Sequence, residues 1–243
     1  MTKETERRFG SELPTAIFPD AEQVELKDII GPHLQAQPDL TEGLPDRVEA
    51  DPECAAAKRA VIAGLPDGII GQILSVGPAG GWELLELRNR YPVGGQIRGV
   101  TLFDEEARLC HKLGFQCAVR DMHDLSDTWP ELFDLVFASH VLEHSPAPVV
   151  ALREFYRVLK PGGYLACVLP DPEGVLHLGN LERVKRQSEI PDHVFLPSAD
   201  TLITMLRCVG FEFVRYSEVA HTCLGKRQYW HRIWIAQKPR ETP

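Results

Sequence analysis

The sequence has few features of a membrane-bound or secreted protein. No apolar run among its 243 residues approaches the roughly 20 residues that span a bilayer. The first ten residues place Lys3, Arg7 and Arg8 among acids and contain no apolar core of a signal peptide. The six cysteines form no CxxC pair and stand in apolar stretches, as reduced core thiols do. These absences predict a soluble, cytoplasmic protein with no membrane partner.

Basic charge is also scarce. The 26 Lys and Arg residues are outnumbered by 35 Asp and Glu residues, giving a net charge of −9, which disfavours a protein whose main task is to neutralise phosphates. Much of the acidity lies in residues 1–60, which hold 13 acidic and 7 basic residues. Two short basic runs, at 183–186 and 225–227, leave a nucleic-acid substrate disfavoured rather than excluded. A solvated surface is the plainer interpretation of both runs.

Proline divides the chain near residue 60. Six prolines interrupt the first 60 residues, so no long helix or strand can run through them. The segment Val24–Ile30 has apolar residues near helical spacing and predicts a short helix that docks on the core. We therefore expect an acidic, proline-rich N-terminal arm or cap at residues 1–60, followed by one main domain at residues 61–243.

From Gln72 onward, strand-like and helix-like segments alternate, which is typical of an α/β fold with a parallel sheet covered by helices. The expected strands are Ile73–Val76, Ile97–Leu102, Phe115–Arg120, Phe133–Ser139, Tyr164–Leu169, Phe211–Tyr216 and Arg232–Ala236. The expected helices pass through Trp82–Leu87, Asp104–Leu113, Leu152–Leu159 (ended by Pro161–Gly163) and the segment from Ser198 to Gly210. The last two strands are close enough in sequence to pair as an antiparallel hairpin.

Glycines follow the first expected strand. In an open parallel sheet, ligands bind at the carboxyl ends of the strands, and glycines there allow a sharp turn and a close approach to the ligand. By itself, such a turn is often only a tight turn. A dinucleotide-binding fingerprint would have glycines at positions 77, 79 and 82, whereas this chain has Ala79 and Trp82. This difference disfavours an NAD-dependent oxidoreductase.

Three segments together carry a more specific resemblance. They are ILSVGPAGG at 73–81, FDLVFASHVLEH at 133–144 and RVLKPGGYL at 157–165. In this order they resemble the class I S-adenosylmethionine-dependent methyltransferases, in particular the group with ubiquinone and small-molecule methyltransferases. The resemblance covers roughly residues 70–240. It implies a Rossmann-like, seven-stranded, mostly parallel sheet with an antiparallel last strand, helices on both faces, a short N-terminal helical cap, and S-adenosylmethionine as cofactor.

The resemblance also implies which residues hold the methionine part of the cofactor. Gly77, Ala79 and Gly81 would line it, and Ser75 would give a neutral contact where many members have an acid. Ala79 replaces a usual glycine, which is tolerable if its φ stays negative. Ser139, at the end of the fourth strand, completes this set.

The ribose and adenine contacts depart further from the family pattern. The family usually has an acid where this chain has Thr101, and a neutral hydroxyl cannot replace a bidentate carboxylate. Because the segment around Thr101 resembles the cyclopropane-synthase branch, we expect Glu106 to supply that carboxylate; the alternative is a solvent-facing helix residue. Asp121 would accept from the adenine amine, with Met122 and Leu102 packing on the ring, unless Asp121 only caps a turn.

Two histidines follow the fourth strand, where the methyl group would lie. The sulfonium already makes the methyl electrophilic, so the enzyme mainly aligns the acceptor and excludes water. Imidazole can take a proton from the acceptor, which makes His140 the first candidate catalytic residue and His144 the second. For His140, packing or a helix-cap contact is an equal alternative. Residues 140, 143 and 144 would share one helical face, a spacing that can bind a divalent metal, but Leu-Glu-His also occurs widely in members with no known metal, and we predict no metal ligands.

Residues 171–197 lie between the fifth strand and the helix capped by Ser198. A loop of this length is usually functional or disordered, and the family places substrate-covering elements here. With the N-terminal arm, it is expected to form the pocket for a small-molecule methyl acceptor. We predict transfer to oxygen, with nitrogen and carbon as further options. Because Ser75, Ala79 and Thr101 depart from the family pattern, a non-catalytic scaffold of the same fold is the main alternative; a homodimer is also expected.

Overall fold

The computed structural model describes residues 52–69, 71–92, 96–125, 129–172, 193–223 and 227–240. The helix expected at 24–30 and the central part of the expected insertion, residues 173–192, lie outside the described residues. Among the described residues, no helix is long and apolar enough to cross a membrane.

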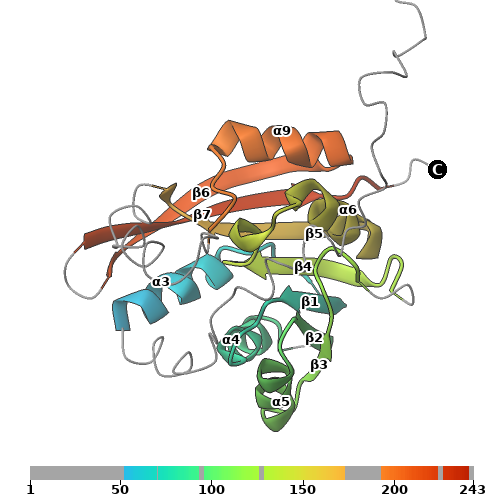
Figure 1. Cartoon of the computed structure of the whole chain (residues 1–243), viewed down its shortest axis with the longest axis vertical. Coiled ribbons are helices and arrows are strands. Elements are labelled where there is room, and N and C mark those ends of the chain that lie inside the picture. The colour runs from blue at the N-terminus through green and yellow to red at the C-terminus, as the bar shows by residue number, and fades with distance from the viewer. Residues whose placement is uncertain are drawn as a thin grey trace, which may run out of the picture.

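Seven strands form one sheet in the order β3-β2-β1-β4-β5-β7-β6 (Figure 1). Their bounds are β1 Gln72–Val76, β2 Gln96–Thr101, β3 Gln116–Val119, β4 Phe133–Ser139, β5 Leu159–Pro170, β6 Glu212–Cys223 and β7 Arg227–Gln237. The first five strands pair in parallel, whereas β7 runs antiparallel to both β5 and β6. This topology confirms the predicted Rossmann-like sheet with an antiparallel last strand.

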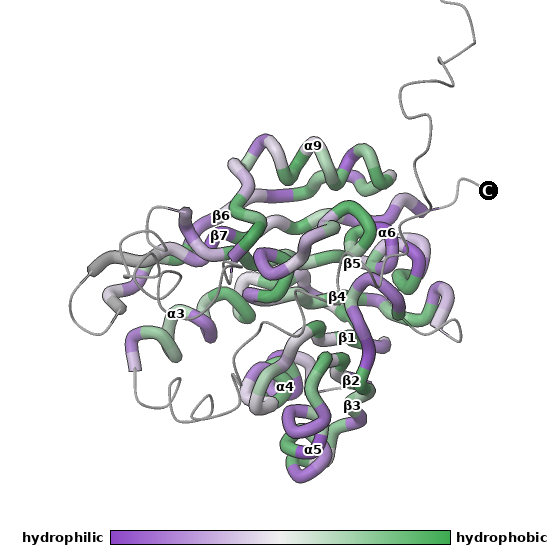
Figure 2. Tube along the Cα trace, in the orientation of Figure 1, coloured by the Kyte–Doolittle hydropathy of each residue, from purple (hydrophilic) through white to green (hydrophobic). Residues whose placement is uncertain are grey.

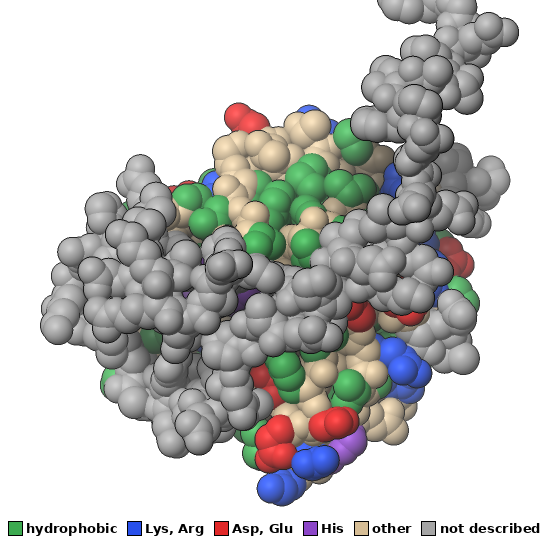
Figure 3. Space-filling view, in the orientation of Figure 1, with side chains coloured by type: hydrophobic (Ala, Val, Ile, Leu, Met, Phe, Trp, Pro, Cys, Tyr) green, Lys and Arg blue, Asp and Glu red, His purple; other side chains and the backbone are tan. Residues whose placement is uncertain are grey.

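Helices cover both faces of the sheet because successive strand residues point to opposite sides. Ile73 and Leu135 pack with α3 (Pro52–Ala63), α4 (Trp82–Arg90) and α5 (Asp104–Lys112). Their neighbours Leu74 and Val136 pack with α6 (Pro148–Val158) and α9 (Ala199–Val209) on the other face. Hydrophobic residues accordingly concentrate along the central strands (Figure 2), while acidic and basic side chains gather over α5 (Figure 3).

The ends of two helices show how far local signals specify the boundaries. Ser198 caps α9 by accepting a hydrogen bond from the backbone N–H of Thr201 (3.1 Å), and Gly210 ends it at φ +113°, both as predicted. The predicted end of α6 was one residue too far along the chain. The helix stops at Val158 and the chain is extended from Leu159, so Pro161–Gly163 lies inside β5. The physical reason is that Lys160, the residue before Pro161, avoids the helical region, so the helix ends ahead of the proline.

Helix α3 packs against the hairpin formed by β6 and β7. The N–H of Thr222 donates to Glu53 at the start of α3 (3.2 Å), and the Arg215 guanidinium donates to the carbonyl of Gly64 just after it. The hairpin strands are longer than predicted, because pairing continues to Cys223 opposite Arg227. Helix α3 also runs across residue 60, where the sequence placed the boundary between arm and domain.

Candidate cofactor and active site

The predicted site residues follow the carboxyl ends of adjacent parallel strands. Strand β1 lies between β2 and β4, and the chain leaves β1 toward one face and β4 toward the other. This divergence is the switch point at which open α/β sheets bind ligands. The segments at 77–81, 101–106, 121–122 and 139–144 therefore lie along one edge of the sheet, as expected from the sequence.

Two glycines of the 77–81 loop occupy positions that a side chain would disturb. Gly77 has φ +66°, and a Cβ there would lie 3.0 Å from Val141 Cγ2. Gly81 precedes α4 with φ +88°, and a Cβ there would lie 2.7 Å from Leu113 Cδ1. The loop thus passes close to the segment after β4 and to the end of α5, which leaves backbone rather than side chains facing a ligand.

Ala79 and Ser75 both depart from the family motif, and the structure places them in different situations. Ala79 has φ +48°, so the condition of a negative φ is not met; the methyl group is held in a left-handed conformation that costs roughly 1 to 2 kcal/mol. Ser75 is fully buried, and its hydroxyl has no hydrogen-bond partner among the described residues. A buried polar atom without a partner is unfavourable, and a contact from a bound polar group would relieve it.

Thr101 and Glu106 form a buried pair at the end of β2. The Thr101 hydroxyl donates to the Glu106 carboxylate, and Glu106 is only 6% exposed. Burial raises the pKa of Glu106 above its ordinary value, although the hydrogen bond from Thr101 lowers it. Glu106 is therefore not a solvent-facing helix residue. It is a carboxylate held beside Thr101 at the end of β2, with an unfavourable charge that hydroxyl donors would stabilise.

Asp121 takes part in a chain of hydrogen bonds after β3. Its Oδ1 accepts from the backbone N–H of His123 (2.9 Å) and lies 2.5 Å from His123 Nδ1, while His123 Nε2 lies 2.6 Å from Ser145 Oγ. Burial raises the pKa of Asp121, but the hydrogen bonds from His123 outweigh it and the pKa is lowered. The order Asp-His-Ser matches a hydrolytic triad, yet Ser145 is 1% exposed, so we interpret the chain as structural.

These hydrogen bonds affect the adenine contact that was expected for Asp121. The alternative role, a turn contact, is present, because Oδ1 of Asp121 accepts from His123. An adenine amine would therefore have to bind the other carboxylate oxygen. Met122 is buried and Leu102 is half-buried.

Ser139 donates its hydroxyl to Glu83 rather than standing alone at the end of β4. The distance to Glu83 Oε1 is 2.9 Å, and the same oxygen lies 3.4 Å from Lys58 Nζ. Glu83 in α4 therefore ties α3 to β4. Sequence reasoning missed both Glu83 and Lys58, since an acid in the first turn of a helix is ordinary and gives no signal of its own.

His140 lies in a constrained position with φ +52°, directly after β4. Its Nε2 is 2.7 Å from His231 Nδ1 on β7, and its Nδ1 is 3.3 Å from Glu143 Oε1. Burial, with the positive charge of Lys58 as the next cause, lowers the pKa of His140 to about 3. The imidazole is neutral, and both of its nitrogens face protein partners. A titration of His140 at an unperturbed value near 6.5 is therefore not expected.

Glu143 and His144 belong to a short 3₁₀ helix, η1 (Leu142–His144), and not to an α-helix shared with His140. The expected single helical face of the three residues was wrong, because the left-handed backbone at His140 breaks the spacing. The structure instead adds His193. One donor atom each of Glu143, His144 and His193 lies within 4.8 Å of the others. Glu143, His144 and His193 have the residue types of a metal site. The sequence spacing indicated Glu143 and His144 as possible ligands but not His193.

Segment 193–195 is tied to η1 by backbone hydrogen bonds. The N–H groups of Val194 and Phe195 donate to the carbonyl of Glu143 (2.9 and 3.0 Å), and the rings of His144 and His193 meet edge to face. Glu143 is fully buried, and burial raises its pKa.

A small pocket lies between α3 and the sheet. It is lined by Lys58, Val61, Ile62, Glu83, Phe137, Ser139, Val168 and His231.

The fold and the loop positions define a class. The order 3-2-1-4-5-7-6 with an antiparallel β7 is that of the class I methyltransferases. One solved structure of similar fold is the N-methyltransferase NodS from Bradyrhizobium japonicum WM9 in complex with S-adenosyl-L-homocysteine. It has a TM-score of 0.62 and 17% identity, covering 87% of this chain and 99% of that one.

The sequence comparisons then name the domain. Residues 74–167 match the family model described as a methyltransferase domain. This match, together with the fold, confirms the predicted resemblance to the S-adenosylmethionine-dependent methyltransferases.

Two curated relatives illustrate the range of the family. A tRNA U34 carboxymethyltransferase of Hydrogenovibrio crunogenus is 32% identical over 111 residues, which is 44% of this chain and 32% of the relative. A ubiquinone biosynthesis O-methyltransferase of Idiomarina loihiensis is 30% identical over 106 residues, which is 40% of this chain and 42% of the relative. The matched part thus spans well under half of the length of either relative.

Proposed function

We propose that this protein transfers a methyl group from S-adenosylmethionine to a small-molecule acceptor, at oxygen first of all, with nitrogen or carbon as the other options. The observation that carries the proposal is the buried Glu106 beside Thr101 at the end of β2, in a chain with a methyltransferase domain. Its carboxylate would take the part of the acid that the family usually has where this chain has Thr101. This argues for a working cofactor site rather than a degenerate one.

The residues around the switch point fit the cofactor. Gly77 and Gly81 would face the methionine part, Glu106 would accept from the ribose hydroxyls, and Asp121 from the adenine amine. The partnerless hydroxyl of Ser75 is a further buried polar atom that fits a polar ligand. The cofactor supplies an electrophilic methyl on a sulfonium. The protein's share is then to hold the acceptor in line and to exclude water.

The two candidate catalytic histidines would have different roles. His140 is held between Glu143 and His231, so it would act as a neutral, oriented group rather than as a strong base. The His144 ring packs edge to face on His193 and is partly exposed, which suits an acceptor-facing residue. If a base takes the acceptor's proton, His144→Ala would reduce turnover by roughly 10² to 10⁴ with cofactor affinity unchanged. A loss below about threefold would mean that alignment alone suffices.

Calorimetric titration with S-adenosylhomocysteine tests the function directly. Micromolar binding supports the proposal, whereas no binding at millimolar ligand would support the non-catalytic scaffold. Mass spectrometry of small molecules that co-purify with the protein would then supply acceptor candidates for a methyl-transfer assay.

A tRNA acceptor is the second candidate, favoured by the similarity to the tRNA U34 carboxymethyltransferase. The net charge of −9 works against it, because tRNA binding relies on neutralising phosphates. A gel-shift titration with total tRNA at low salt separates the two: submicromolar binding that weakens steeply with salt would favour tRNA. Four of the described cysteines, Cys110, Cys117, Cys167 and Cys208, are free thiols, which supports a cytoplasmic location.

A further inference from the structure

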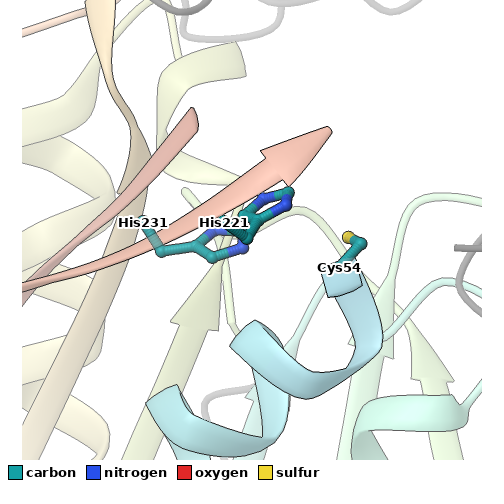
Figure 4. A group of neighbouring side chains, drawn as sticks. All are labelled: Cys54, His221 and His231. Carbon is teal, nitrogen blue, oxygen red and sulfur yellow. The ribbon is translucent and has the colours of Figure 1, made fainter. Parts of the chain in front are cut away.

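A group of metal-binding side chains lies apart from the residues assigned to the cofactor. Cys54 stands in the first turn of α3, His221 on β6 and His231 on β7. One donor atom of each lies within 4.8 Å of the other two. Figure 4 shows the two imidazole rings side by side on the hairpin, with Cys54 facing the same space from the start of α3. A thiol and two imidazoles are the donors that zinc-type ions prefer.

The hairpin register explains why the two histidines meet. Residue 231 pairs with Val219, so His221, two residues farther along β6, points to the same face as Val219 and lies diagonal to His231. The rings stack with centroids 4.9 Å apart and planes 17° apart. Cys54 is brought to them by the docking of α3, which the hydrogen bond between Glu53 and Thr222 fastens at the neighbouring residues (3.2 Å).

The surroundings of His231 resemble those of a metal ligand. Metal-binding histidines usually donate their second ring N–H to a partner that fixes the tautomer and the ring orientation. Here His231 Nδ1 is 2.7 Å from His140 Nε2, and His140 Nδ1 is 3.3 Å from Glu143 Oε1. A consistent assignment has His231 Nδ1–H donate to His140 Nε2, which makes Nε2 of His231 the ligand atom.

We propose that Cys54, His221 and His231 bind a divalent transition-metal ion of the zinc type. Three protein ligands leave one tetrahedral position for a water molecule or a donor atom of a ligand, as in sites that keep an open position. Bond lengths of about 2.3 Å to sulfur and about 2.0 Å to nitrogen place tetrahedral donors about 3.3 to 3.6 Å apart. A separation of 4.8 Å, the upper limit of the present spread, would therefore have to contract by about 1.2 to 1.5 Å on binding.

The site does not depend on the proposed methyl transfer, so its test uses the metal itself. The purified full-length chain is stripped with a chelator and titrated with Co²⁺, which replaces zinc and reports its ligands by absorption. We expect one Co²⁺ per chain, visible bands of tetrahedral intensity and a near-ultraviolet charge-transfer band from the Cys54 thiolate. Added Zn²⁺ should remove all of these bands, because zinc binds such sites more tightly than cobalt.

Substitutions distinguish this site from the other candidate group, Glu143, His144 and His193. Cys54→Ser should abolish the thiolate band, and both Cys54→Ser and His221→Gln should weaken Co²⁺ binding by more than about 100-fold, the upper range for loss of an outer partner. His140→Ala should weaken it by about 10- to 100-fold through the orientation of His231. The matched control is Cys208→Ser, which alters an exposed thiol on α9 and should leave the spectrum unchanged.

Three outcomes would overturn the proposal. One is the absence of Co²⁺ binding by a chain whose circular dichroism shows it folded. Another is a thiolate band that survives in Cys54→Ser. The third is Co²⁺ binding without a thiolate band that His193→Ala removes, which would assign the ion to Glu143, His144 and His193 instead. The partly exposed positions of Cys54 and His221 allow both variants to fold even if changes at the buried His231 do not.

Discussion

Replacement of Glu106 is the sharpest test of the cofactor site, because this residue departs from the common family pattern. Its carboxylate is 6% exposed and receives one hydrogen bond, from Thr101. If the ribose hydroxyls also donate to it, Glu106→Ala removes hydrogen bonds to a charged acceptor, which contribute roughly 1.5 to 3 kcal/mol. The dissociation constant for S-adenosylhomocysteine should then rise about 10- to 150-fold. Calorimetric titration at neutral pH measures it.

The adjacent residue gives a matched control. Glu105 lies on the same turn of α5, but its side chain is 51% exposed and pairs with Arg108 on the surface. Glu105→Ala removes the same charge from the same helix and should leave the dissociation constant within about twofold, as expected for an exposed pair. Equal constants for Glu106→Ala, Glu105→Ala and the unaltered chain would refute the ribose contact and place it on other residues.

The raised pKa of Glu106 adds a dependence on pH. Since the folded chain holds this proton more tightly than the unfolded chain, stability falls as pH rises from the ordinary value of 4.5 through the raised value. Glu106→Gln removes this loss, so the variant should melt above the unaltered chain at neutral pH without cofactor, and the difference should shrink below about pH 4.5. The cofactor affinity should depend on pH in the opposite direction to the stability. The unaltered chain should bind the cofactor more weakly as the pH falls, whereas Glu106→Gln should bind it weakly at every pH.

Three further substitutions follow from the same contacts. Asp121→Ala should weaken binding of S-adenosylhomocysteine in the same titration; an equal drop in melting temperature with and without ligand would leave Asp121 only its turn contact with His123. Glu83→Ala should lower the free energy of unfolding in urea by about 1 to 3 kcal/mol, because Ser139 and Lys58 lose their acceptor. The control Glu86→Ala breaks the more exposed pair with Arg59 and should cost below about 1 kcal/mol. Similar losses for the two variants would contradict this role of Glu83. Gly81→Ala should destabilise the chain more than Gly114→Ala, whose added methyl meets nothing within 4 Å; the reverse order would rule out the contact with the end of α5.

Much of the sheet could be predicted because its inner strands β1 and β4 are largely apolar and buried. Strand β4, Phe133–Ser139, was predicted to the residue. The strand ends then placed the segments around residues 77, 101, 121 and 140 on one edge, because parallel strands share a carboxyl end. Helix α9 followed from its serine cap and terminal glycine.

The contacts within the site could not be predicted, because they join residues far apart in the sequence. The pairing of His140 with His231 spans 91 positions and that of Ser139 with Glu83 spans 56, and no local pattern marks either. The positive φ of Ala79 and His140 was also beyond sequence reasoning, since neither residue type favours it; packing around the switch point imposes it. By contrast, Glu106 could be inferred from the sequence, because the segment around Thr101 resembles the cyclopropane-synthase branch.

The docking of α3 on the β6–β7 hairpin has a consequence for synthesis of the chain. The hydrogen bonds that hold this helix join residues 151 and 169 positions apart. During translation α3 therefore leaves the ribosome long before the hairpin exists, and its apolar residues Val61 and Ile62 stay without their final neighbours until the last strands emerge. Such non-local closure slows folding and prolongs exposure of the central strands. The order of the segments along the chain thus delays the completion of this face of the core until the end of synthesis.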